Sequence, residues 1–336
     1  MGWRPVLERF SRSGSSAATK GQPISSRSGD SVAATQPPTA KSISTPSAPL
    51  LRTGSHVFSV DVEEYFHAHA LAPHAPQSDW NSLPSRVEEG TALLLDLLAR
   101  HEAHATFFVL GWVADRHPAM VRRIAEAGHE VASHGYWHER VAPMSPNRFR
   151  RDLRRSVDVL EHITGRRVLG YRAPSFSIVP GAEWAFDMML EEGLAYDSSL
   201  FPIHRPGSGY PNCNPLPHYL VRPAGELLEL PLTTTVIGGL RLPAAGGAWL
   251  RHLPYGLVER AFLESSGRGV PGMFYVHPWE MDVHQPVLAG LSPLTRLRHY
   301  GGTGRMLTRV ERLLSTFRFT SVERSLQDAL AVRAAA

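Results

Sequence analysis

Cysteine is nearly absent from this sequence, because Cys213 is the only one in 336 residues. A single thiol excludes an internal disulfide and a metal site built from several cysteines. The sequence also lacks an apolar run long enough to span a bilayer, and its first residues lack the apolar segment of a signal peptide. These absences predict a cytoplasmic protein without a transmembrane segment.

Lysine is scarce as well, since it occurs only at Lys20 and Lys41, and arginine carries nearly all of the positive charge. The densest run of arginines has the spacing of an exposed helix face: Arg148, Arg150, Arg151, Arg154 and Arg155. Nucleic-acid binding requires a coherent basic surface, usually within a known motif, and we find no such motif. We therefore interpret the run as a solvated helix face and expect no nucleic-acid partner.

The first fifty residues differ in composition from the rest of the chain. From about residue 11 to residue 49 they are mostly Ser, Thr, Ala, Pro and Gly, with few large apolar side chains. Such a segment buries too little surface to offset the entropy lost on ordering. We predict a disordered tail over residues 1–52 and an ordered chain from residue 53 onward.

Beyond this tail, strand-like and helix-like patterns alternate along the chain. Predicted strands cover residues 56–62, 105–110, 130–133, 168–172, 227–232 and 273–276, and predicted helices cover residues 86–100, 118–127, 146–164 and 180–192. Alternating strands and helices indicate an α/β fold around a parallel sheet. Periodicity alone does not decide whether this sheet is open or closed into a barrel.

Polar residues stand at the carboxyl ends of several predicted strands, which is where α/β barrels carry their chemistry. They are Asp61 and Glu63 after the first strand, His134 and His138 after the third, Arg172 at the end of the fourth, and His277 after the last. This coincidence is the main reason to expect an active site in this protein.

The two histidines, His134 and His138, are four residues apart, so one turn of the backbone could direct both imidazoles to a single metal ion. The chain contains 17 histidines, and pairs at this spacing also arise by chance. Gly135 follows His134, which excludes the zinc-protease motif with Glu at that position. The pair alone is therefore weak support for a metal site.

Asp61 and Glu63 lie two residues apart, and in extended backbone they point to the same side while Val62 enters the core. A strand that simply ends in solvent would show the same acids. A metal hydrolase, however, requires one carboxylate that binds the ion and a second that accepts a proton.

Arg172 and His277 have ordinary readings when each is taken alone. Arg172 fits a surface arginine, or a buried one that holds an acid ionised. His277 ends an apolar strand before Pro278, and it fits a hydrogen-bonded structural histidine or a proton donor to a leaving amine.

Together these motifs resemble those of the NodB-homology polysaccharide deacetylases. The matching segments are Ser59-Val60-Asp61-Val62-Glu63, Ser133-His134 through His138, Arg172-Ala173-Pro174 and Val276-His277, with the stretch 105–109 between the first two. The resemblance covers about residues 56–280. It implies an irregular (β/α)7 barrel, a catalytic domain over residues 53–285, and a hydrolase that removes N-acetyl groups from an N-acetylated polysaccharide.

The resemblance also implies a role for each matching residue. His134 and His138 correspond to imidazole ligands of a divalent metal, which in this family is usually zinc. Asp61 corresponds to the general base, and Arg172 to the arginine that pairs with this base. His277 corresponds to the general acid that protonates the departing amine. The backbone N–H of the residue after Pro174, here Ser175, corresponds to an oxyanion donor.

The sequence departs from the family pattern at Val62, where many members have a metal-binding Asp. Strand geometry favours Glu63 as the replacement ligand, and Glu64 is the alternative if a loop turns it inward. At Ser175 many members have an aromatic residue. The family often has an acid that orients this histidine, and Asp197 and Glu229 are candidates between which the sequence does not choose. A loop-capping Asp and an ordinary strand-end Glu are the favoured interpretations of these two residues.

The resemblance extends further for the deacetylases encoded with exopolysaccharide and exosortase systems. Segments 65–67, 246–251, 277–280 and 298–300 and the final helix-strand-helix carry this likeness. It implies a family-specific C-terminal extension over residues 286–336 and an exopolysaccharide substrate. A contact with a membrane-bound exopolysaccharide assembly system is a further expectation.

Two other functions are compatible with the same motifs. One is an inactive glycan-binding module, which the change at Val62 keeps open. The other is a metal-dependent amidohydrolase that acts on peptidoglycan or a small cyclic amide. Four aromatic residues fit either sugar-stacking walls or the core: Tyr136, Trp137, Trp249 and Trp279.

Overall fold

The computed structural model describes residues 54–205 and 207–335, and the side chains up to residue 328. The predicted tail over residues 1–52 lies outside the described residues. The strands are β1 (His56–Val62), β2 (Thr106–Val109), β3 (Glu130–Ser133), β4 (Gly170–Tyr171), β5 (Tyr196–Asp197), β6 (His218–Arg222), β7 (Gly225–Glu229), β8 (Thr234–Ile237), β9 (Leu240–Pro243), β10 (Met273–Val276) and β11 (Phe319–Thr320). The helices of four or more residues are α2 (Val87–Arg100), α3 (Gly111–Arg116), α4 (Pro118–Glu126), α5 (Pro146–Thr164), α6 (Trp184–Glu191), α7 (Ala248–His252), α8 (Tyr255–Gly267), α9 (Pro293–Tyr300), α10 (Met306–Thr316) and α11 (Val322–Ala335).

The main sheet runs in the order β10-β1-β2-β3-β4-β5-β7-β6, and β11 pairs with the first residues of β1. Every pair along this path is parallel except β6 with β7. The predicted α/β fold with a parallel sheet is therefore confirmed. Because the strands are parallel, the carboxyl ends of β1, β3, β4 and β10 meet at one edge of the sheet.

The described strands do not close the sheet into a barrel, because no ladder joins β6 to β10. Single hydrogen bonds do tie the chain after β7 to β10. Thr233 N–H donates to the Met273 carbonyl at 3.4 Å, and Tyr275 N–H donates to the Ala245 carbonyl at 2.7 Å. The (β/α)7 barrel stays a prediction.

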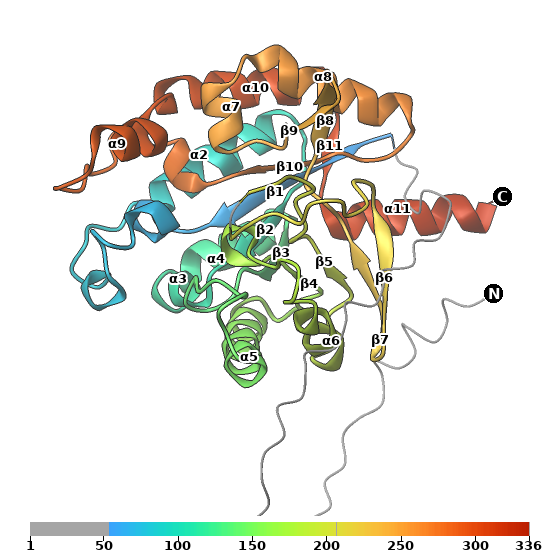
Figure 1. Cartoon of the computed structure of the whole chain (residues 1–336), viewed down its shortest axis with the longest axis horizontal. Helices are drawn as coiled ribbons and strands as arrows, with labels where there is room; N and C mark the ends of the chain where they lie inside the picture. The colour runs from blue at the N-terminus through green and yellow to red at the C-terminus, as the bar shows by residue number, and fades with distance from the viewer. Residues whose placement is uncertain (1–53, 206, 336) are drawn as a thin grey trace, which may run out of the picture. The chain divides into compact units, whose positions relative to one another are not determined.

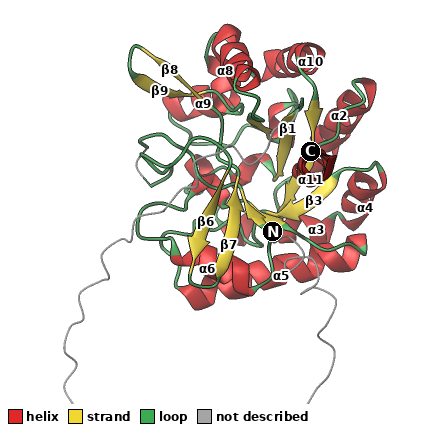
Figure 2. Cartoon of the chain, turned by 90° about the vertical axis from the view of Figure 1, so that its right-hand side faces the viewer, coloured by secondary structure: helices red, strands yellow, loops and turns green. Residues whose placement is uncertain are grey.

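The helices cover the sheet from two sides, with α3, α5 and α6 on one side of the strands and α2, α8 and α10 on the other (Figure 1). Figure 2 shows the same layers from a second direction, with β8 and β9 projecting as a separate hairpin. The core consists of apolar residues from the strands and from the inner faces of these helices, among them Phe58, Phe107, Leu153 and Phe274. None of the helices in the described part of the chain is long and apolar enough to cross a membrane.

Helix α5 has the predicted limits because its end signals are local. Ser145 accepts a hydrogen bond from the Arg148 N–H, Pro146 occupies the first turn, and Gly165 closes the helix with φ of 65°. The arginine run lies on this helix and pairs with acids from neighbouring elements. Its ion pairs are Arg148–Glu139, Arg150–Glu191, Arg150–Glu192, Arg154–Glu192 and Arg155–Asp115.

Several predicted elements differ from the structure at their ends. The strand predicted over residues 227–232 is β7, Gly225–Glu229, and two other elements are clearly shorter. Helix α6 begins at Trp184 instead of residue 180, because Gly181 has a φ of 98°, which no helix accommodates. The predicted strand over residues 168–172 is reduced to Gly170–Tyr171 in β4. In both places the error lies at the ends of an element, where local patterns carry little information.

Candidate metal and catalytic site

Three side chains converge at the carboxyl edge of the sheet. Glu63 follows β1, while His134 and His138 follow β3, and one ligand atom from each lies within 4.8 Å of the other two. His138 Nε2 lies 2.6 Å from Glu63 Oε2, and both side chains are buried. Glu63 and Asp61 share a side of β1 because side chains alternate along a strand.

The donor set of this cluster fits a divalent ion. His134 Nδ1–H donates to the Arg172 carbonyl at 2.8 Å, so its Nε2 is unprotonated and available as a ligand. Burial lowers the pKa of His134 to about 4, which keeps the imidazole neutral. Although burial acts to raise it, the charges of His138 and His277 hold the pKa of Glu63 well below its usual value. Two imidazoles and one ionised carboxylate are the ligands of a catalytic zinc-type site.

Asp61 lies beside this cluster and is held by a buried arginine. Arg172 Nη1 donates to Asp61 Oδ1 and to Ser59 Oγ, both at 2.7 Å. The other side of the guanidinium donates to the Ser198 carbonyl at 3.1 Å and to the Ser198 hydroxyl at 2.9 Å. Because Arg172 is fully buried and held at both ends, it fixes the position of the Asp61 carboxylate.

His277 completes the group from β10. Its Nε2 lies 4.0 Å from Asp61 Oδ2 and 3.7 Å from Glu63 Oε1, and its Nδ1 lies 2.9 Å from Glu280 Oε2. Burial alone would lower the pKa of His277, but the charges of Glu280 and Glu63 raise it to about 9. The imidazole is therefore protonated at neutral pH, as a proton donor has to be.

Glu280 contacts His277, whereas the two candidates from the sequence, Asp197 and Glu229, bind other groups, as their ordinary interpretations predict. Asp197 accepts from the N–H and hydroxyl of Ser199, and Glu229 accepts from the Leu200 N–H. Burial raises the pKa of Asp197 to about 6, and burial and the charge of Asp197 raise that of Glu229. The two acids influence each other and hold the chain after β5, on a different part of the sheet edge.

A local signal for Glu280 was present in the sequence. Pro278 starts a tight turn, Pro278–Glu280, that brings the Glu280 carboxylate back to the His277 N–H at 3.0 Å. The same carboxylate also accepts a hydrogen bond from Arg251, whose Nε donates to Glu280 Oε1 at 2.7 Å. The segment His277-Pro278-Trp279-Glu280 thus contains both the histidine and its partner.

Of the four aromatic residues, Tyr136 and Trp279 are buried and Trp137 and Trp249 are half-buried. Trp279 stacks on His277 with 5.0 Å between ring centroids, and its indole N–H donates to Glu63 Oε1 at 3.1 Å. This contact holds the Glu63 carboxylate, so Trp279 supports the cluster from within the core instead of forming a sugar-binding wall.

The structure directs Glu64 away from the cluster. Its carboxylate accepts hydrogen bonds from the Ser85 hydroxyl and, at 2.9 Å, from the Arg86 N–H, next to the start of α2. Ser175 lies in the turn Pro174–Phe176 and has a φ of 57°, a left-handed conformation that is uncommon for a residue with a side chain. This turn follows β4 and lies at the same edge of the sheet as Arg172.

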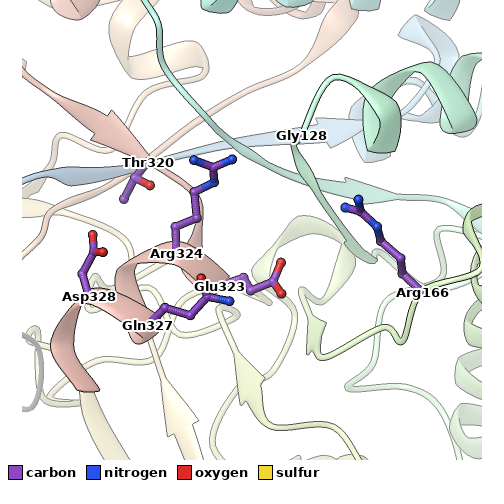
Figure 3. A pocket seen from close by; sticks show the side chains of 7 residues that line it. All are labelled: Gly128, Arg166, Thr320, Glu323, Arg324, Gln327 and Asp328. Carbon is purple, nitrogen blue, oxygen red and sulfur yellow. The ribbon is translucent and has the colours of Figure 1, made fainter. Parts of the chain in front are cut away.

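A hollow of about 510 Å³ lies at the opposite, amino edge of the strands (Figure 3). Its lining residues come from the loops before β3 and β4 and from the end of β11 and the first turns of α11: Gly128, Arg166, Thr320, Glu323, Arg324, Gln327 and Asp328. None of the residues described above contributes to it, so this hollow is separate from the candidate site.

The parallel sheet, the buried ion pair and the three converging ligands define an α/β protein with a candidate metal site at its strand ends. A family model described as polysaccharide deacetylase matches residues 80–180, and a model described as domain of unknown function DUF3473 matches residues 198–327. Together with the relatives described next, these matches support membership of the polysaccharide deacetylase family.

Curated relatives match part of the chain. A peptidoglycan deacetylase of Helicobacter pylori is 33% identical over 34% of this chain and 38% of its own length. A chitooligosaccharide deacetylase of Sinorhizobium fredii is 33% identical over 30% of this chain and 44% of its own length. The chain thus spans less than half the length of these relatives.

Solved structures share the fold. A candidate polysaccharide deacetylase from Mycobacterium smegmatis superposes with a TM-score of 0.56 at 22% identity, covering 87% of this chain and 96% of its own. Puue allantoinase superposes with a TM-score of 0.54 at 17% identity, covering 84% of this chain and 93% of its own. At these identities the likeness concerns the architecture only.

Proposed function

We propose that this protein is a metal-dependent deacetylase that hydrolyses the N-acetyl group of an N-acetylated glycan. The observation that carries the proposal is the placement of two buried carboxylates, Asp61 and Glu63, on either side of a cation-forming imidazole. His277 Nε2 lies 4.0 Å from the first and 3.7 Å from the second. Glu63, His134 and His138 would hold a divalent ion, and zinc suits two imidazoles and a carboxylate.

Two steps of the hydrolysis can be assigned to residues of this chain. When bound, a divalent ion supplies Lewis acidity, which polarises an amide carbonyl and lowers the pKa of water. Asp61 accepts the proton of the attacking water, and Arg172 holds this carboxylate in place. His277 donates its proton to the amide nitrogen as the carbon–nitrogen bond breaks. The products are acetate and a free amino sugar.

The nature of the glycan is inferred from resemblance. The relatives named peptidoglycan deacetylase and chitooligosaccharide deacetylase support an acetamido sugar as the reacting unit. The likeness of residues 286–336 to the extension of exopolysaccharide-associated deacetylases supports an exopolysaccharide. A cytoplasmic location and a contact with a membrane-bound assembly system stay predictions from the sequence.

The experiment that tests the proposal is acetate release from oligomers of N-acetylglucosamine by the zinc-loaded protein. We expect acetate in proportion to amine formed, loss of activity after chelation, and recovery when zinc is restored. Calorimetric zinc titration runs beside it. Zinc binding without acetate from neutral or acidic N-acetylated oligosaccharides would contradict a deacetylase and favour a glycan-binding module.

A further inference from the structure

Two arginines border the candidate site without taking part in the chemistry assigned above. Arg140 follows the ligand His138 by two residues, and Arg205 lies in the loop after β5. Among the described residues, neither arginine belongs to an ion pair, whereas Arg148, Arg150 and Arg154 all do. Unpaired arginines beside a catalytic centre are candidates for binding a negative group of a ligand.

Arg140 is fixed in place by its neighbours along the chain. The Val141 N–H donates to the buried Ser177 hydroxyl at 2.9 Å, which ties the loop after His138 to the turn that contains Ser175. Arg140 is half-buried, and its Nε is buried with no hydrogen-bond partner among the described residues. A buried donor of this kind is costly unless a ligand or water accepts from it.

The loop that carries Arg205 packs on the same turn. Gly209 N–H donates to the Phe176 carbonyl at 3.2 Å, and the guanidinium of Arg140 lies directly against Gly207, where a Cβ would collide with it. The absence of a side chain at residue 207 thus makes room for Arg140. The two loops that carry these arginines therefore both pack against the segment Pro174–Ser177, and Arg140 contacts the loop of Arg205.

The positive charges of Arg140 and Arg205 act on the pKa values of neighbouring side chains. Burial, together with the charges of Arg140, His138 and Arg205, lowers the pKa of His69. Burial raises the pKa of Tyr275, and the charge of Arg205 opposes this rise. The Tyr275 ring lies 5.5 Å from that of His277, so the field of Arg205 reaches the catalytic histidine's neighbour.

The nearest acid in sequence does not neutralise these charges. Glu139 directly precedes Arg140, but its carboxylate pairs with Arg148 at 2.6 Å on the exposed side. Arg205 is exposed, and Arg140 presents a planar guanidinium whose pair of donors matches a carboxylate or a phosphate. The site therefore combines acetamide chemistry with an uncompensated positive border.

We propose that Arg140 and Arg205 bind an anionic group of the glycan, so that the preferred substrate is an acidic N-acetylated polysaccharide. This inference rests on the proposed function for the reacting group, and on the two arginines for the acidic one. The negative group is the carboxylate of a sugar near the acetamido sugar, or a phosphate with the same charge and similar acceptors.

The test compares matched ligands by calorimetry with the zinc-loaded full chain. The first ligand is an oligosaccharide of alternating N-acetylglucosamine and glucuronic acid, and the second is its carboxyl-reduced, neutral form. A third, an N-acetylglucosamine oligomer with a terminal phosphate, distinguishes the source of the charge. We expect the parent protein to bind an acidic form at least about tenfold more tightly than the neutral form, with a preference that falls as salt is raised.

The variants Arg140→Gln and Arg205→Gln should each lose most of this preference and leave the affinity for the neutral oligosaccharide unchanged. Arg140→Lys should retain part of it, which separates loss of charge from misfolding. Arg154→Gln is the matched control, because this arginine pairs with Glu192 and its removal leaves the Glu139–Arg148 pair intact, and it should behave as the parent does.

Equal affinity of the parent for acidic and neutral forms would overturn the inference, as would a preference that survives both substitutions. Binding is measured in the Asp61→Asn form of the parent and of each variant, so that no ligand is turned over, and acetate release by the proteins that retain Asp61 is an independent result. Equal binding with acetate release would refute the acidic substrate and leave the deacetylase in place. Preferential binding of the acidic form with no acetate release would refute the deacetylase and leave the anion site.

Discussion

The two ends of the same parallel sheet each bury acids, and they use them differently. At the amino end Glu130 is fully satisfied by the rest of the chain. It accepts hydrogen bonds from Thr106 Oγ1 at 2.6 Å, from Tyr196 Oη at 2.8 Å and from the Glu323 N–H at 2.9 Å. The last of these joins the first turn of α11 to β3, so this acid anchors the C-terminal helix.

At the carboxyl end the acids face histidines, which can gain or lose a proton or bind a metal ion. Glu63 lies against His138, and Asp61 lies between Arg172 and His277. A buried acid therefore does not by itself indicate a functional site, because buried polar groups usually have hydrogen-bond partners within the protein. Convergence of potential ligands and proton carriers is the more informative feature.

Removing the proposed base should have the largest effect and would separate the two ends most clearly. Asp61→Asn keeps the shape of the side chain but cannot accept a proton, so we expect acetate release to fall by about 10³-fold. Zinc affinity should change little, because Asp61 is outside the ligand cluster. Steady-state kinetics and zinc calorimetry check both parts. Retained activity would remove Asp61 from the chemistry.

The adjacent acids Glu63 and Glu64 offer a second, sharper contrast. Glu63→Gln should weaken zinc binding by at least about 100-fold. Changing a hydrogen-bond partner of a metal ligand lowers metal affinity by up to about 100-fold, and loss of the ligand itself should lower it further. Glu64→Gln should keep the zinc affinity and lower the free energy of unfolding by about 1 kcal/mol, because it weakens acceptance from Ser85 and Arg86. The reverse pattern in zinc calorimetry would make Glu64 the ligand.

At the amino end we expect an effect on stability alone. Glu130→Ala leaves three donors without an acceptor and should lower the free energy of unfolding by about 3 kcal/mol, measured by urea denaturation. Turnover per folded molecule should stay that of the parent. Glu130→Gln keeps an acceptor and is the milder control. A drop in turnover for the folded variant would mean that the two ends are coupled.

The smallest effect concerns the titration of His277 in the metal-free protein. Glu280 and Glu63 raise the pKa of His277 to about 9 against the opposing effect of burial. A raised pKa stabilises the fold fully below pH 6.5, and this contribution is lost as the pH rises to about 9. In Glu280→Gln the imidazole should lose its proton at a lower pH, which NMR titration of the ring would detect. An unchanged titration would assign the shift to another group.

Elements whose ends depend on neighbours along the chain can be predicted from the sequence. The limits of α5 follow from Ser145, Pro146 and Gly165, whose capping roles are local. The strand ends that carry Asp61 and His134 follow from apolar runs that stop at polar residues. The four motifs can also be recognised in the sequence, and the residues that they place at strand ends are those that the structure brings together.

The contacts between groups on different strands depend on packing and cannot be predicted from sequence spacing. Asp61 and Arg172 are 111 residues apart, yet they form one buried ion pair because β1 and β4 end at the same edge of the sheet. Asp197 and Glu229 also stand at strand ends, but packing places them against Ser199 and Leu200 instead of His277. A hydrogen bond forms with whichever partner the packing places within about 3 Å, and sequence spacing does not encode that distance between strands.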